Sequence, residues 1–395
     1  MYFGVDMKIY SRKYQSKILQ LCSYFPVVAI VGARQVGKTT LAKLVSNSIG
    51  KRIVHLDLEL NSDLSKLENA ELFFKANRDK CIIIDEVQLR PDIFPLIRAI
   101  VDTTGESCQF IITGSASPGL LQQSTESLAG RIAYVEIRPF SVDELPDGIS
   151  VEKNWFRGGF PKALFAPDDR AAFNWLDNFI KTYVERDLRM LGVSVQPLML
   201  RRLWTMLAFL NGNVMNYSNL SKSLGITVNT VKRYIDFFEH AYLIKRIPAN
   251  YSNLSKRIIK SPKLFVNDTG VLHALLGVKD LNVLYGSPYL GSSWEGYCIN
   301  QIIGMTKDTY FASYYRTKEG AECDLVLSKG DTAEFAIEIK FSSQPRLTKG
   351  NTEALKAINA KYNYVIIPEG EPYPLREDVT AIGIKEFIEI LGNKN

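Results

Sequence analysis

The stretch Gly32-Ala-Arg-Gln-Val-Gly-Lys-Thr39 decides the architecture of the N-terminal part of the chain. It follows Pro26-Val-Val-Ala-Ile-Val31, a short β-branched run typical of a strand buried on both faces, and it precedes helically spaced apolar residues in Leu41–Val45. The glycines allow backbone N–H groups to wrap phosphates without Cβ clashes, and the helix N-terminus adds a positive dipole end. The pattern therefore predicts a phosphate-binding loop rather than a plain glycine turn.

The loop also predicts the nucleotide contacts. Lys38 is expected to reach the β and γ phosphates of ATP, and the hydroxyl of Thr39 to ligate Mg²⁺. The residues predicted to bind the nucleotide or its metal are Gly32, Ala33, Arg34, Gln35, Val36, Gly37, Lys38, Thr39, Thr40, Asp85 and Ser115.

Two further buried strands supply polar residues at their ends. Cys81-Ile-Ile-Ile-Asp85 brings an acid to the carboxyl edge of the sheet, where Asp85 can hold Mg²⁺ and the next residue, Glu86, can orient the attacking water. Gln109-Phe-Ile-Ile-Thr113 ends before Gly114-Ser115, so that Thr113 or Ser115 either senses the γ-phosphate or belongs to an ordinary turn. The adjacent acids favour ATP hydrolysis over nucleotide storage.

Arg131, in Leu128-Ala-Gly-Arg131, has two interpretations. It can serve as an arginine finger on the nucleotide of a neighbouring subunit, which would make the protein a homo-oligomer, or it can form a surface ion pair. Arg34 is a weaker candidate for the finger.

Charge is distributed unevenly along the 395 residues. Lys181–Lys263 contains fourteen Lys or Arg and four acids, a net charge of +10, whereas the whole chain carries +6. Within this segment, helical spacing over Arg201–Asn211, a short helix Asn219–Leu224 capped by Ser218, Gly225, and a helix capped by Thr227 predict a winged helix-turn-helix. Its outward cations make DNA or RNA a candidate partner, and protein contact is the alternative.

The third helix of this segment has a clear division of faces. The apolar stripe consists of Val231, Ile235 and Phe238, and the residues expected to point outward are Asn229, Thr230, Lys232 and Arg233.

The C-terminal third contains a candidate metal site. Strands over Tyr314–Arg316, Cys323–Leu327 and Phe335–Lys340 place Glu338 and Lys340 on one face, with Asp324 on the neighbouring strand. The carboxylates can hold Mg²⁺ and the lysine can position a water; Glu295, at the start of a predicted helix, can add an oxygen ligand. An exposed Glu–Lys pair on a hairpin is the simpler alternative.

These motifs together resemble two known groups. GARQVGKTT, IIIDEVQ, FIITGS and LAGR followed by RPFS resemble a prokaryotic AAA-type P-loop ATPase whose C-terminal half is a domain of unknown function; FRGGFP, YVERD, KSPKLF, DTG and YRTK agree. The C-terminal acids and lysine resemble the PD-(D/E)XK nuclease superfamily, although Cys323 stands where that pattern has proline. The resemblance implies an ATPase joined to a winged helix and a nuclease-like fold.

We therefore expect an α/β protein with a P-loop NTPase parallel sheet, an α-helical winged helix-turn-helix and a restriction-endonuclease-like α/β domain. The predicted parts are an AAA-like ATPase domain (1–144), a helical extension (145–196), the winged helix (197–253) and the nuclease-like domain (254–395). The cofactors expected are ATP and Mg²⁺. No apolar run is long enough to span a membrane, and cysteines without CxxC pairs suit the cytoplasm.

Two functions remain open at this point. The first is an ATPase that couples its nucleotide state to a winged helix and a nuclease acting on nucleic acid. The second is an ATP-dependent regulatory or scaffold protein whose nuclease-like domain is inactive and binds a partner.

Overall fold

The computed structural model describes residues 10–117, 128–184, 196–250 and 259–394. The chain divides into two compact units: unit 1 comprises Met1–Arg138 with Pro146–Gly148, and unit 2 comprises Pro139–Leu145 with Ile149–Asn395. The predicted boundary at 253/254 and residues 185–187 of the YVERD motif lie outside the described residues.

Unit 1 is built around a parallel sheet. In its described part the strand order is β2-β3-β4-β1-β5, and every neighbouring pair runs parallel. All residues of β1, β3 and β4 are buried, as expected for central strands covered on both faces. The strands are β1 (Val27–Val31), β2 (Ile53–Asp57), β3 (Cys81–Asp85), β4 (Phe110–Gly114) and β5 (Ile132–Glu136).

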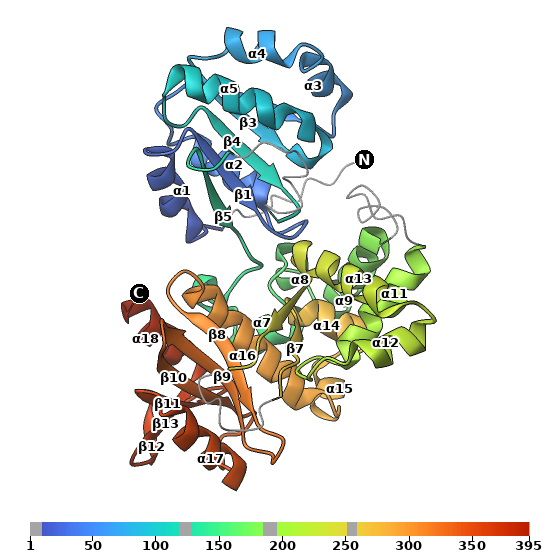
Figure 1. Cartoon of the computed structure of the whole chain (residues 1–395), viewed down its shortest axis with the longest axis vertical. Helices are drawn as coiled ribbons and strands as arrows, with labels where there is room; N and C mark the ends of the chain where they lie inside the picture. The colour runs from blue at the N-terminus through green and yellow to red at the C-terminus, as the bar shows by residue number, and fades with distance from the viewer. Residues whose placement is uncertain (1–9, 118–127, 185–195, 251–258, 395) are drawn as a thin grey trace. The chain divides into compact units, whose positions relative to one another are not determined.

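Helices follow the strands of this sheet, as parallel pairing requires crossover connections (Figure 1). Because β1 and β3 are parallel members of one sheet, the phosphate loop and the Asp85–Glu86 pair meet at its carboxyl edge, as predicted. The helices of unit 1 are α1 (Tyr14–Cys22), α2 (Lys38–Ser46), α3 (Asn61–Lys66), α4 (Ala70–Ala76) and α5 (Phe94–Thr104).

The first part of unit 2 is helical. It contains α7 (Val151–Arg157), α8 (Pro161–Leu164), α9 (Asp169–Thr182), α11 (Pro197–Phe209), α12 (Tyr217–Leu224) and α13 (Val228–His240). Thr227 is the N-cap of α13, as predicted, and Val231, Ile235 and Phe238 are fully buried. The prediction that Ser218 caps the preceding helix is wrong: Asn216 accepts the N–H of Asn219 at 3.1 Å, and Ser218 lies inside α12.

A two-stranded ribbon follows α13. Strand β6 (Ile244–Ile247) pairs antiparallel with β7 (Lys263–Val266), which lies beyond the predicted end of the winged helix at residue 253. The backbone N–H and C=O groups of β6 need hydrogen-bond partners, and β7 supplies them. Parallel bridging of Ala249 to Tyr314 links the residues after β6 to the C-terminal sheet defined below.

The C-terminal sheet of unit 2 has, in its described residues, six strands in the order β12-β13-β11-β10-β9-β8. Its pairs β10–β11 and β11–β13 are parallel and the others are antiparallel. The strands are β8 (Phe311–Arg316), β9 (Glu322–Lys329), β10 (Thr332–Ile339), β11 (Tyr362–Ile367), β12 (Tyr373–Arg376) and β13 (Val379–Gly383).

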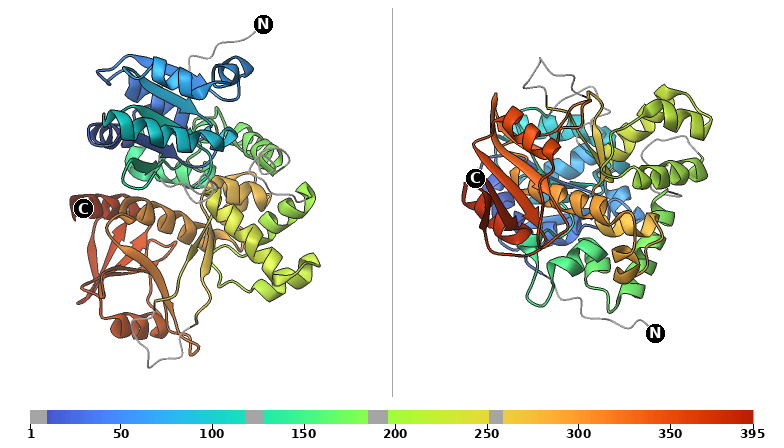
Figure 2. Two further views of the ribbon diagram at one scale, coloured as in Figure 1. Left: turned by 45° about the horizontal axis from the view of Figure 1, so that its top comes forward. Right: turned by 90° about the horizontal axis from the view of Figure 1, so that it is seen from below.

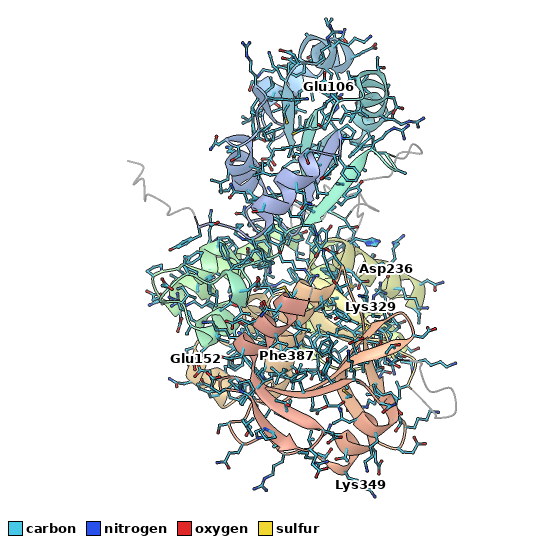
Figure 3. The ribbon with its side chains drawn as sticks, turned by 90° about the vertical axis from the view of Figure 1, so that its left-hand side faces the viewer. Glu106, Glu152, Asp236, Lys329, Lys349 and Phe387 are labelled. Carbon is cyan, nitrogen blue, oxygen red and sulfur yellow. The ribbon has the colours of Figure 1, made fainter. Side chains whose placement is uncertain are left out.

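Helices cover both faces of the C-terminal sheet (Figure 2). Helices α16 (Leu290–Thr306) and α18 (Ile384–Lys394) pack against each other and one face, and α17 (Lys349–Ile358) packs on β8 and β9. Phe387 of α18 is fully buried, whereas Lys349 at the start of α17 is exposed; both residues are labelled in Figure 3. Two short helices, α14 (Thr269–Leu275) and α15 (Leu281–Tyr285), connect β7 to α16.

Candidate functional site: a nucleotide site and a carboxylate cluster

The phosphate loop takes the backbone path that its sequence requires. Gly32 has φ of +151°, and a Cβ placed there would lie 2.2 Å from the carbonyl oxygen of Ile137. Gly37, the N-cap of α2, has φ of +98°, and Gln35 has φ of +68°. Glycine is thus needed at position 32 for close approach as well as for conformation, and at position 37 for conformation alone.

Lys38 lies folded against this loop. Its side chain is buried, and Nζ donates to the carbonyl oxygens of Gly32 at 3.2 Å and Ala33 at 3.1 Å and to Ser115 Oγ at 3.1 Å. Burial lowers the pKa of Lys38, and the two carboxylates at the end of β3 oppose that shift. The ammonium is therefore held inside the loop that would surround the phosphates.

The residues predicted to hold Mg²⁺ lie together. Thr39 Oγ1 donates to Asp85 Oδ2 at 2.6 Å, and the hydroxyl of Thr113 donates to the other Asp85 oxygen. The Thr39 hydroxyl lies in the first turn of α2, and the Asp85 carboxylate lies at the end of β3. A hydroxyl and a carboxylate placed in this way are the oxygen ligands that Mg²⁺ takes beside nucleotide phosphates. The donor set fits the metal.

Glu86 is positioned by three neighbours. Its backbone is left-handed, with φ of +54°, and its N–H donates to Thr113 Oγ1 at 3.2 Å. Ser115 Oγ donates to Glu86 Oε2 at 3.0 Å, and the side-chain amide of Gln88 donates to the same carboxylate. No role was predicted for Gln88, although it is the last residue of the motif IIIDEVQ.

Arg131 lies at the edge of the sheet opposite the phosphate loop. It immediately precedes Ile132, which pairs with Val27 at the start of β1, whereas the loop follows the end of β1. Its guanidinium forms a two-bond ion pair with Asp102, one bond being 3.1 Å long. This is the geometry of the surface ion pair, and the finger stays a prediction about a neighbouring subunit.

Two other arginines of unit 1 form contacts at the phosphate loop. Arg34 Nη2 is 2.9 Å from Glu59 Oε1. Arg12, for which no role was predicted, donates from Nη1 to the carbonyl of Val36 at 3.1 Å and from Nη2 to that of Arg138 at 2.6 Å. It thereby ties the phosphate loop to the residue at which unit 1 passes to unit 2. An isolated arginine before the first helix gives no sequence signal for such a contact.

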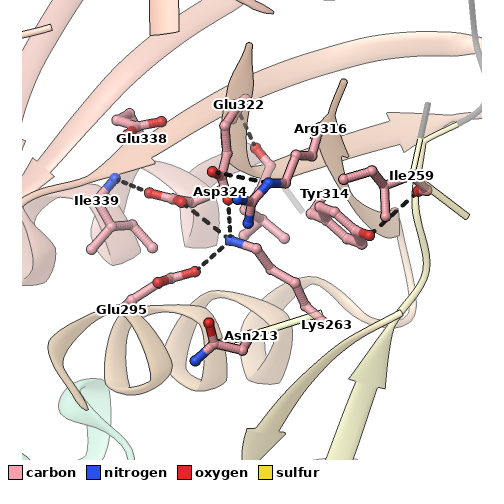
Figure 4. Close-up of polar contacts among 12 residues, drawn as sticks. Asn213, Ile259, Lys263, Glu295, Tyr314, Arg316, Glu322, Asp324, Glu338 and Ile339 are labelled. Atoms are coloured by element: carbon pink, nitrogen blue, oxygen red, sulfur yellow. Dashed lines mark hydrogen bonds and ion pairs between the residues drawn. The ribbon is translucent and has the colours of Figure 1, made fainter. Parts of the chain in front are cut away.

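The carboxylate cluster of unit 2, defined as Glu295, Glu322, Asp324 and Glu338, has a lysine at its centre (Figure 4). Nζ of Lys263 lies 3.0 Å from Glu295 Oε1, 2.8 Å from Glu322 Oε1 and 3.5 Å from Asp324 Oδ1. No role in this site was predicted for Lys263 or Glu322. Lys263 occurs in the quoted motif KSPKLF, but only the fold brings β7 to this position.

The remaining members of the cluster contact Lys340 and the backbone. Glu338 Oε1 accepts from Lys340 Nζ at 2.7 Å and from Asn351 Nδ2 at 2.8 Å, so the two residues share a face as predicted. Asp324 Oδ2 accepts the N–H of Ile339 at 3.0 Å. Glu295 lies inside α16, not at the start of a helix as predicted, because α16 begins at Leu290.

Burial dominates the electrostatics of the cluster. It raises the pKa of Glu295 to about 7 and that of Glu338 well above its ordinary value. Burial alone would lower the pKa of Lys263, but the carboxylates of Glu295, Asp324 and Glu322 raise it well above the usual value. Lys263 is therefore a permanent cation inside the cluster.

The cluster does not fit the Mg²⁺ expected from its acids. Lys263 stands between Glu295 and Asp324, and the described residues contain no group of three or more His, Cys, Asp or Glu arranged to hold a metal. The proposal of a three-carboxylate metal site from Glu295, Asp324 and Glu338 is therefore not supported by the geometry.

The basic surplus of Lys181–Lys263 is partly neutralised in the fold. Arg246 pairs with Asp236 at 2.8 Å and with Glu239, and Lys263 is buried. Lys232 and Arg233 on α13 are exposed, and Lys232 Nζ lies 5.5 Å from the ring centre of Tyr217. Helix α13 thus presents two exposed cations, but it also carries Asp236 and Glu239, and less positive charge is available than the sequence count suggests.

Family models match three successive parts of the chain. Residues 24–146 match a model described as an AAA domain, residues 149–282 match a domain of unknown function, DUF8612, and residues 290–387 match another, DUF4143. Unit 1 has the parallel α/β sheet and phosphate loop of an AAA-type P-loop ATPase, and a separate β-rich domain follows at the C-terminal end.

The chain is also similar to two mycobacterial proteins and to solved structures that include a Walker-type ATPase. Uncharacterized proteins of Mycobacterium tuberculosis and Mycobacterium bovis are each 34% identical over 363 residues, which is 92% of this chain and 81% of theirs. The Walker-type ATPase of Pyrococcus abyssi is similar with a TM-score of 0.48 and 17% identity, covering 68% of this chain and 96% of its own. A RuvB variant of Thermotoga maritima gives 0.31 and 16%, covering 61% and 91%.

The described residues include no helix that is both long and apolar enough to cross a bilayer.

Proposed function

The chain belongs to the same family as the two mycobacterial proteins and carries an AAA domain, and from this premise we propose that it is a Mg²⁺-dependent ATPase. Its reaction is hydrolysis of ATP to ADP and phosphate. The observation that carries the proposal is the meeting of Lys38, Thr39 and Asp85 beside the Glu86 carboxylate at one edge of the sheet.

Each residue has a distinct task in this reaction. Lys38 exchanges its loop carbonyls for the β and γ phosphate oxygens of ATP, and Thr39 and Asp85 hold the metal. Mg²⁺, when bound, neutralises charge on the phosphates. Glu86 orients and polarises the attacking water, and Ser115 and Gln88 keep its carboxylate in place.

The hydrolysis proposal is tested by paired substitutions. Lys38→Ala should abolish ATP binding, whereas Glu86→Gln should bind ATP and lower turnover by about 100-fold or more, because binding does not need the base. Nucleotide binding by fluorescence and phosphate release give the two readouts. Glu106→Gln, an exposed acid of unit 1 paired with Lys51, is the control. Equal turnover by Glu86→Gln and the parent chain would remove Glu86 from the mechanism.

We further propose that the nucleotide state controls nucleic-acid binding by a winged helix formed by α11, α12, α13 and the β6–β7 ribbon. The supporting observations are the helix order, the Thr227 cap of α13, and the exposed Lys232 and Arg233. An arginine finger from Arg131 of a neighbouring subunit would complete the nucleotide site in a homo-oligomer, after release from Asp102.

Binding of duplex DNA, single-stranded DNA and RNA by fluorescence anisotropy tests this second part. Lys232→Ala with Arg233→Ala should weaken binding to all sequences about equally and reduce the dependence on salt, because lysine and arginine contact phosphates. Lys349→Ala, an exposed lysine on α17, is the matched control. Failure of the folded protein to bind any of the three at low salt would assign the helices to protein contact.

A further inference from the structure

Lys263 is built into unit 2 from several directions. It begins β7, where it pairs with Ile247 of β6 and bridges to Val214 on its other side. Its Nζ lies 5.6 Å from the ring centre of Tyr314, whose hydroxyl donates to the carbonyl of Ser261 at 2.5 Å. With 2% of its side chain exposed, the ammonium is held in one place.

The ammonium occupies the position that a metal would need. Glu295 and Asp324 come from α16 and β9, and Lys263 contacts one oxygen of each, as Figure 4 shows. A divalent cation bound to the same oxygens would lie within a few ångströms of the ammonium, in a buried site where like charges repel strongly. Lysine and metal are therefore alternatives at this position.

Few oxygens of the cluster remain for a metal elsewhere. Asp324 Oδ2 accepts a backbone N–H, and Glu338 Oε1 accepts from both Lys340 and Asn351. Glu338 Oε2 is buried without a hydrogen-bond partner among the described residues. Most carboxylate oxygens of the cluster are thus bonded to protein donors rather than available to a metal.

We propose that Lys263 is the resident cation of the carboxylate cluster and stands where a nuclease would hold its divalent metal, so that this domain does not cut nucleic acid. The ion pairs fasten β7, and with it the β6–β7 ribbon, to α16 and the C-terminal sheet. The inference concerns unit 2 alone and does not rest on the ATPase proposal.

The first test measures Mn²⁺ binding to the full chain by electron paramagnetic resonance of the free ion. An Asp85→Asn background removes the acidic metal ligand of the nucleotide site. With Lys263 present, this protein should bind no Mn²⁺ at concentrations of the ion up to about 1 mM, and the parent chain should not nick supercoiled plasmid with Mg²⁺ or Mn²⁺, with or without ATP.

The second test exchanges Lys263 in the same background. Lys263→Ala removes both charge and volume, so it should bind about one Mn²⁺ and gain thermal stability when Mn²⁺ is added. Lys263→Met removes the charge but fills the space, and Lys263→Arg keeps the charge; neither should bind Mn²⁺. Asp324→Asn added to Lys263→Ala should abolish the new binding.

Two results would overturn the proposal. One is stoichiometric Mn²⁺ binding in the presence of Lys263 that Glu338→Gln removes. The other is metal-dependent plasmid cleavage by the parent chain that Asp324→Asn abolishes. Both are measured on proteins that keep Lys263, so the proposal can fail even if Lys263→Ala does not fold. Loss of ATPase activity in Lys38→Ala has no bearing on either result.

Discussion

Gly32 is where the phosphate loop contacts the backbone that leaves unit 1. Ile137 donates its N–H to the carbonyl of Val31 at 2.7 Å, and its own carbonyl lies where a Cβ of residue 32 would be. Any side chain at this position must displace a main-chain segment. The motif explains this glycine by phosphate approach, and the fold adds a second reason.

Gly32→Ala should therefore lower the free energy of unfolding of unit 1 by about 1–3 kcal/mol and weaken ATP binding, because strain and overpacking act together. Gly37→Ala is the control: its φ of +98° is also unfavourable for alanine, but no atom lies within 4 Å of the added Cβ. In urea denaturation, Gly32→Ala should have a lower free energy of unfolding than Gly37→Ala. Equal free energies of unfolding would show that the backbone at Ile137 moves to admit the added Cβ without loss of stability.

At the scale of elements, a buried polar network joins α7, α14 and α16. His273 Nδ1 is 2.8 Å from the carbonyl of Phe156, which can only accept, so Nδ1 carries the proton. Nε2 then accepts from Ser293 Oγ at 2.6 Å, and that hydroxyl in turn accepts from Trp155 Nε1 at 2.9 Å. The network is complete only with a neutral imidazole.

This network predicts a pH dependence. Burial lowers the pKa of His273 to about 4 from the ordinary 6.5, so between these values the unfolded chain binds a proton that the folded chain does not. Stability from this residue is present above pH 6.5 and is lost as the pH falls toward 4, by about 3 kcal/mol in total. Asp268, whose pKa burial raises to about 6, has the opposite sign, because its folded form gains a proton first.

Comparison of variants isolates the contribution of His273 to the pH dependence of stability. The difference in unfolding free energy between the parent chain and His273→Asn should shrink as the pH is lowered from 7 to 4, whereas Asn229→Ala, which removes no titratable group at an exposed position of α13, should give a constant difference. Denaturant titrations at four pH values provide the measurement. A difference for His273→Asn that does not change with pH would contradict the buried neutral imidazole.

At the scale of the whole molecule, the two compact units have separate cores, and we predict two thermal transitions. ATP analogue with Mg²⁺ at about 100 times its Kd should stabilise unit 1 by about 2.7 kcal/mol and raise the midpoint of its transition by about 5–10 °C. Scanning calorimetry should show the shift in one transition, and Lys38→Ala should remove it. A single transition that shifts as a whole would show that the units unfold together.

The sequence by itself determined the local features of this protein. The phosphate loop, the Asp85–Glu86 pair and the Thr227 cap are encoded by neighbours along the chain, because strand burial, helix capping and glycine conformation are local effects. Alternation along two strands also predicted that Glu338 and Lys340 share one face, with Asp324 on the neighbouring strand. These features suffice to predict the nucleotide site and most of the acids of the carboxylate cluster.

Only the tertiary structure decided what those acids surround. Lys263 lies 61 residues from Asp324 and 32 from Glu295 in sequence, and it reaches them because β7 pairs with β6 and lies beside α16. The contacts of Arg12 with Val36 and Arg138 are likewise long-range. Spacing along a chain cannot predict such pairs, because a buried charge finds its partners through packing between elements, and that packing made Lys263 the counter-ion where the sequence predicted a metal.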